Sequence, residues 1–182
     1  MIQFRFNPRK ALQAIEWMLA RAAGPVDFHT LLKAVYFADK EMLNTHGRPI
    51  FGATYRAMEF GPVPLQVYEM LKCEPIWLSE LQQDEYPWAR EGYRVKLHSQ
   101  LNVDPVPEDI APGEMRLLER AFDMSRGMTF NRRTRETHGM DWVEGTRRPG
   151  GRMAYEDMIA TERADRAALI EELEAMGPRL VL

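Results

Sequence analysis

Apolar residues recur at helical spacing along most of the chain, and short segments rich in Gly and Pro separate these stretches. The first stretch follows Asn7-Pro8, a typical helix start with Asn as N-cap and Pro at the first helical position. The longest stretch follows Asp27 as N-cap and stops at Gly47. The pattern predicts helices over residues 8–23, 28–46, 62–72, 113–126, 130–138, 153–160 and 162–176.

Between these helices the pattern is weaker. Polar and apolar residues alternate over 93–98, which predicts one half-buried strand but does not identify its partner. Residues 52–58 fit either a short helix or an extended connection, whereas 75–92 and 103–112 are expected to be irregular. We therefore expect a mainly α fold: a compact helical domain with a small β-strand or hairpin element.

One charge lies in the middle of an apolar helix face. In the predicted helix over 28–46, the apolar stripe is centred on Leu32, and Asp39 falls within it. A buried carboxylate must find hydrogen-bond donors or take up a proton, because an unpaired buried charge is costly. We expect these donors to be helix N-terminal amides that follow the Gly61-Pro62 turn.

The 182 residues suit one domain, and the net charge of −3 does not indicate a nucleic-acid partner. Cys73 is the single cysteine, which excludes an internal disulfide, and the sequence has no apolar run of membrane-spanning length. We expect a soluble cytoplasmic protein. Residues 1–160 should form the domain, with the C-terminal helix and apolar tail of 161–182 packed on it.

Charge is uneven near the C-terminal end. Residues 126–152 hold seven Arg against three acidic residues, and residues 153–182 hold seven acidic residues against three Arg. We favour the interpretation that these two segments face each other or water. The alternative is a DNA-binding transcriptional regulator that uses the Arg-rich 126–152 segment on phosphates.

No residue pattern in the sequence indicates catalysis. The four histidines are scattered without a second ligand at metal-binding spacing, and the glycines form no phosphate-binding loop. We therefore predict no enzyme activity, no cofactor and no metal. Aromatic residues beside arginines are instead typical of protein-binding surfaces. The candidates for partner binding are Phe37, Tyr55, Arg56, Phe60, Arg132, Arg133 and Arg135.

Several short motifs resemble the Panacea, or SocA-like, antitoxin domain. They are L-L-K-A-V-Y-F-A-D-K-E at 31–41, G-R-P-I at 47–50, Tyr55, and F-G-P-V-P-x-x-V-Y at 60–68, where Phe60 replaces a common Tyr. A second, shorter match is the H-x-x-x-W spacing of His138 and Trp142. Together they cover roughly residues 8–160. The motif residues are Lys33, Tyr36, Asp39, Gly47, Pro49, Gly61, Pro62, Tyr68, His138 and Trp142.

The resemblance implies an antitoxin that binds and neutralises a cognate protein toxin. It also implies a second possibility, a proteolytic adaptor that delivers the toxin to the ClpXP protease. The apolar tail Leu180–Leu182 fits two roles, presentation to the ClpX unfoldase or packing on the domain.

Overall fold

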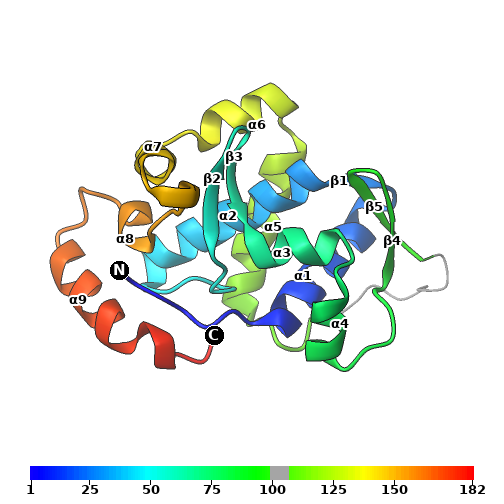
Figure 1. Ribbon diagram of the computed structural model, residues 1–182, viewed down its shortest axis with the longest axis horizontal. Coiled ribbons are helices and arrows are strands. Elements are labelled where there is room, and N and C mark those ends of the chain that lie inside the picture. The colour runs from blue at the N-terminus through cyan, green and yellow to red at the C-terminus, as the bar shows by residue number, and fades with distance from the viewer. Residues whose placement is uncertain (99–106) are drawn as a thin grey trace.

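The computed structural model describes residues 1–98 and 107–182, and it confirms a mainly helical domain with small β elements (Figure 1). The helices are α1 Pro8–Ala22, α2 Phe28–His46, α3 Leu65–Leu71, α4 Pro75–Leu81, α5 Pro112–Arg126, α6 Phe130–Thr137, α7 Met140–Arg147, α8 Tyr155–Met158 and α9 Arg166–Met176, with 3-10 turns at Pro149–Gly151 and Gly177–Arg179. The strands are β1 Val26–Asp27, β2 Tyr55–Met58, β3 Gly61–Pro64, β4 Trp88–Glu91 and β5 Arg94–Leu97. None of the helices described is long and apolar enough to cross a membrane.

Helix α2 is the central element, and it contacts α5, β3, α6, α3 and α8 (Figure 1). Both of its ends match the sequence prediction. The Asp27 side chain accepts a hydrogen bond from the Thr30 amide, and Gly47 ends the helix in a left-handed conformation with φ of 71°. Because α2 is buried on most sides, every polar group on its inner faces needs a partner from another segment.

The strands form two small sheets. In one, β5 pairs antiparallel with both β1 and β4, which supplies the partners that the sequence could not identify for 93–98. In the other, β2 and β3 form a hairpin in which Tyr55 pairs with Pro64 and Met58 pairs with Gly61. Residues 52–58 were predicted to be either a short helix or an extended connection. The structure shows the extended form, because β2 covers Tyr55–Met58.

The prediction that Pro62 opens the third helix was wrong, because pairing with β2 extends the backbone through Pro64 and α3 begins at Leu65. Residues 75–92 are also more ordered than predicted, since they hold α4 and β4.

Gly145 lies inside α7, where a Cβ would stand 2.6 Å from the Met153 Cγ. Within the predicted loop 103–112, residues 103–106 lie outside the described residues.

The C-terminal residues pack on the rest of the domain. Helix α9 begins at Arg166, after Asp165, rather than at residue 162 as predicted from the sequence. The Leu182 side chain is buried, and the Asn7 Nδ2 donates a hydrogen bond of 2.7 Å to the Leu182 carbonyl oxygen. Within the tail, the last residue therefore contacts the domain, whereas Val181 is 96% exposed.

Candidate partner-binding face

The β2–β3 hairpin is held by side chains that bind every second carbonyl around its tip. The Trp142 Nε1 donates to the Met58 oxygen at 2.9 Å, and the Lys33 Nζ donates to the Pro62 oxygen at 2.8 Å. Between them, the His29 Nε2 lies 3.2 Å from the Phe60 oxygen. These donors come from α2 and α7, so the position of the hairpin tip is fixed by helices far from it in sequence.

Gly61 allows the hairpin to approach α2 and α6 closely. Its φ is 99°, a conformation that side chains disfavour. A Cβ at this position would overlap the Thr137 Oγ1 and lie 2.9 Å from the Lys33 Nζ. Glycine is thus required here both by backbone conformation and by space.

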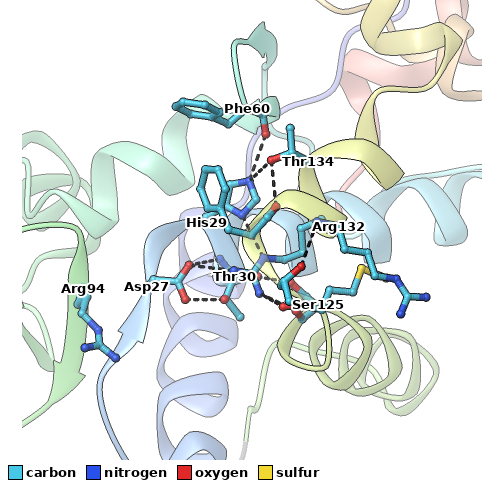
Figure 2. A network of polar contacts seen from close by, with 12 residues as sticks. Asp27, His29, Thr30, Phe60, Arg94, Ser125, Arg132 and Thr134 are labelled. Carbon is cyan, nitrogen blue, oxygen red and sulfur yellow. Dashed lines mark hydrogen bonds and ion pairs between the residues drawn. The ribbon is translucent and has the colours of Figure 1, made fainter.

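The hydrogen bonds of His29 fix its protonation state (Figure 2). The Arg133 Nε donates to the His29 Nδ1 at 3.0 Å, so Nδ1 must be unprotonated and Nε2 must carry the proton donated to the Phe60 oxygen. Burial, with Lys33 as the second cause, lowers the pKa of His29 to about 4. His29 is therefore neutral at pH 7, which is the state that this network requires.

Arg133 serves this network and does not lie on the outer face of α6 as the sequence suggested. Its NH1 donates to the Ser125 oxygen at 2.9 Å and to the Met128 oxygen at 2.7 Å. Its NH2 lies 3.4 Å from the Asp27 Oδ1. Arg133 is 6% exposed, so it positions α6 and His29 and is not available for contact with a partner.

Asp39 is completely buried and accepts hydrogen bonds from the segment that follows Gly47. The Ile50 and Phe51 amides donate to Oδ1 at 2.7 and 3.1 Å, and the Tyr55 hydroxyl donates to Oδ2 at 3.0 Å. The donors predicted at the Gly61-Pro62 turn were therefore wrong, although the need for donors was correctly predicted. Burial still raises the pKa of Asp39 to about 7.

A surface depression of about 500 Å³ lies between the hairpin tip and α6. Phe60 on the hairpin is 49% exposed, Phe130 on α6 is 43% exposed, and their ring centroids are 5.1 Å apart. We call this surface the hairpin–α6 face; its lining residues are Glu59, Phe60, Phe130, Asn131, Thr134, Arg135 and His138. Its two exposed rings and its polar rim are the features expected of a surface that binds another protein.

The chain was compared with models of known protein families. The family model described as "Antitoxin SocA-like, Panacea domain" matches residues 31–143, more than half of the chain. The chain belongs to the SocA-like Panacea family. Searches of curated proteins and of solved structures each found no match.

Most of the Panacea motif residues in this chain hold the hairpin and the turn before it. Lys33 and Trp142 bind hairpin carbonyls, and Gly61 allows the close approach. Gly47 and the buried Pro49 shape the segment whose amides reach Asp39. The motif is therefore largely structural, and its effect is to present the tip residue Phe60.

The second part of the Panacea motif joins α7 to α2. His138 and Trp142 stack with ring centroids 3.7 Å apart and an interplanar angle of 4°. The Tyr36 hydroxyl donates to the Asp141 Oδ2 at 2.5 Å, and the Lys40 Nζ lies 3.0 Å from the same oxygen. The sequence analysis assigned no role to Asp141, which lies between the apolar residues Met140 and Trp142 in a segment too short to show a helical period.

The structure separates the candidates for partner binding into three groups. Phe60 and Arg135 line the hairpin–α6 face, and Arg132 is exposed on the same helix as Arg135. Arg56 is exposed on β2 and Phe37 is half-buried, both outside the set that lines the face. Tyr55 was a wrong candidate because it is 2% exposed and donates to Asp39.

Phe130 was not among the candidates, although it forms half of the apolar wall. The sequence offers one signal for it, since an aromatic residue directly after the Thr129 N-cap begins a helix whose remaining residues are polar. Tyr68, a motif residue, is half-buried on α3 and packs edge-on against Phe28 at 6.1 Å.

Lys33 is expected to make stability depend on pH above neutrality. It is 1% exposed, and burial followed by the charge of Arg133 lowers its pKa from 10.5 to about 7. Between these two values the unfolded chain binds more protons than the folded chain, so stability rises as pH increases from 7 to 9. Lys33→Met should lose this rise in urea unfolding at pH 7, 8 and 9.

The matched control is Lys96→Met, because Lys96 is exposed on β5. It should keep the pH dependence of the parent protein. If Lys33→Met kept the same slope as the parent, Lys33 would have an ordinary pKa and the account of its burial would be wrong.

Proposed function

We propose that this Panacea protein is an antitoxin that binds and neutralises a cognate protein toxin through the hairpin–α6 face. The family match supports an antitoxin role. We choose this face because of its two exposed rings, Phe60 on the hairpin tip and Phe130 on α6. The hairpin tip is also held in place by side chains that bind its carbonyls.

The rigidity of the hairpin bears on affinity. A contact residue that is already fixed in its bound position loses little conformational entropy when a partner binds. Aromatic residues near the centre of an interface also contribute a large share of the binding energy. Phe60 combines both properties, since its carbonyl is bound by His29 and its ring rests edge-on against Phe130.

We propose that neutralisation needs no bond-making chemistry by this chain. The buried ionisable groups of the described residues have internal tasks: Asp39 binds backbone amides and Asp141 binds Tyr36 and Lys40. Binding alone, which blocks the working surface of the toxin, is sufficient for the antitoxin role.

Delivery of the bound toxin to ClpXP is the finer alternative within the same function. The tail supports it less than the sequence suggested, because Leu182 is buried against the domain. An adaptor would have to engage ClpX through another segment or release this tail first.

The alternative of DNA binding through residues 126–152 gains no support from the structure. Arg133 is buried and Arg147 and Arg148 are paired with Glu144 and Asp157. Three of the seven arginines of this segment are thus engaged within the protein, and Arg148 pairs with Asp157 of the acidic segment 153–182.

The test is coexpression with the protein encoded beside this gene. The proposal expects that the neighbouring protein alone stops growth, that coexpression restores growth, and that the two proteins copurify. Toxin half-life with and without ClpX then separates masking from delivery, since only delivery shortens the half-life. Toxicity that persists despite high antitoxin levels, or the lack of a complex, would refute the proposal.

A further inference from the structure

The hairpin–α6 face has a defined polarity. Along α6, the lining residues Phe130, Asn131, Thr134, Arg135 and His138 share one side of the helix, and the hairpin supplies the opposite wall. Glu59 places its negative charge on the hairpin side, whereas Arg135 places its positive charge on the helix side. The two phenyl rings of the wall lie beside these charges.

Arg135 is the arginine that lines this face, and within residues 1–98 and 107–182 it has no carboxylate partner. Among the residues that the structure describes, no carboxylate lies within 4.0 Å of Arg135, whereas Arg132 has Glu136 at 3.9 Å. Arg135 is exposed, so its guanidinium can form a bidentate ion pair with an incoming carboxylate.

The buried guanidinium of Arg133 lies beneath the face and adds to its positive potential. Lys33 contributes less, because burial lowers its pKa to about 7 and it loses its charge above that pH. Arg133 donates to His29, and its one carboxylate neighbour among the described residues is Asp27 at 3.4 Å.

We infer that the face receives a segment of the partner toxin that places an aromatic or long aliphatic side chain against Phe60 and Phe130 and an adjacent carboxylate on Arg135. This inference rests on the proposed function and specifies the chemistry of the partner. The rings exclude water around the ion pair, which strengthens it relative to an exposed pair.

The same features favour a protein over DNA as the partner. A phosphate backbone would leave the two exposed rings without an apolar partner. The net charge of −3 also opposes approach to DNA.

The test is a charge reversal, Arg135→Glu, with the purified toxin encoded beside this gene as the probe. We expect calorimetry to show binding at least about tenfold weaker than for the parent protein, with a shallower dependence on salt. Arg116→Glu is the control, because Arg116 is exposed on α5 and the change in net charge is the same. It should alter affinity by less than about twofold.

A second arm identifies the partner group. Acidic residues of the toxin that lie next to an exposed apolar residue are replaced one at a time by Lys. One such substitution should weaken binding to the parent protein and restore binding to Arg135→Glu, which is the sign of a direct pair in a double-mutant cycle.

The outcomes separate the two proposals. If the parent protein binds the toxin and Arg135→Glu binds it as well as Arg116→Glu does, the inferred partner chemistry is wrong while the antitoxin function stands. If the parent itself does not bind, both fail. A gel shift on upstream DNA that Arg135→Glu abolishes, with toxin binding unchanged, would assign the face to nucleic acid and overturn the inference.

Discussion

Asp39→Ala is expected to lower the free energy of unfolding by about 3 kcal/mol or more, because it leaves several buried donors without an acceptor. The Ile50 and Phe51 amides and the Tyr55 hydroxyl all end on the Asp39 carboxylate. Asp39 and Tyr55 are at most 2% exposed, so water does not replace the lost acceptor in the native structure. Urea unfolding followed by circular dichroism measures the effect.

Asp39→Asn is the matched control for this prediction. An Asn side chain can accept from the two amides and donate to the Tyr55 oxygen, so at pH 7 it should retain most of the stability that Ala loses. If the Ala variant were as stable as the parent, the burial and hydrogen bonding of Asp39 would be refuted.

Comparison of the parent protein with Asp39→Asn also reports the pKa of Asp39. In the folded protein burial raises this pKa from 3.8 to about 7, so between these values the folded chain binds more protons than the unfolded chain. The contribution of Asp39 to stability therefore increases as pH falls from 7 toward 4. His29 acts in the opposite direction over 4 to 6.5, because its pKa is lowered.

The comparison of parent and Asp39→Asn cancels the contribution of His29, which both proteins share. The stability of the parent relative to the variant should rise as pH falls from 8 to 5. A difference that does not change with pH would show that Asp39 keeps an ordinary pKa in the folded protein.

The elements predicted well from the sequence are those whose signals are local. Helices α1, α2 and α6 begin after Asn7, Asp27 and Thr129, and in each case the capping side chain accepts from a backbone amide as expected. The helical spacing of apolar residues and the N-cap residue lie within one stretch of chain, so the sequence alone is sufficient to place these helices.

The hairpin could not be predicted in this way because its stability comes from elsewhere. Pro62 and Pro64 resemble the start of a helix, and the side chains that bind the hairpin carbonyls are contributed by α2 and α7. The donors to Asp39 were misplaced at the Gly61-Pro62 turn for the same reason, since only tertiary packing brings the Ile50 and Phe51 amides to this carboxylate.

Some residues of the hairpin–α6 face were named from the sequence. Phe60 and Arg135 were identified by residue type and now lie on one face, together with the missed Phe130. Arg133 was misassigned because charged residues on a short polar helix usually face water. Here the packing of α6 against α2 turns Arg133 toward His29 and the Ser125 carbonyl. Hydrogen bonds to these acceptors offset the cost of removing the guanidinium from water.

The second large effect concerns the two rings at the centre of the hairpin–α6 face. Replacing both Phe60 and Phe130 with Ser should weaken toxin binding at least about 100-fold, because aromatic residues at the centre of an interface commonly contribute 2 kcal/mol or more each. Both side chains are more than two-fifths exposed, so the fold should tolerate the change. Thermal unfolding of the free variant checks that it does.

The control is Ile76→Ser on α4, because Ile76 is 67% exposed and lies outside the set that lines the face. It removes an exposed apolar side chain of similar character from another part of the surface (Figure 1). We expect it to bind the toxin with the affinity of the parent protein.

The most direct measurement is therefore the dissociation constant of the toxin complex for the parent, Phe60→Ser/Phe130→Ser and Ile76→Ser proteins. The account predicts that the first substitution pair abolishes or severely weakens binding while Ile76→Ser leaves it intact. Equal affinity for all three proteins, with the folded state preserved, would show that the hairpin–α6 face is not where this antitoxin meets its partner.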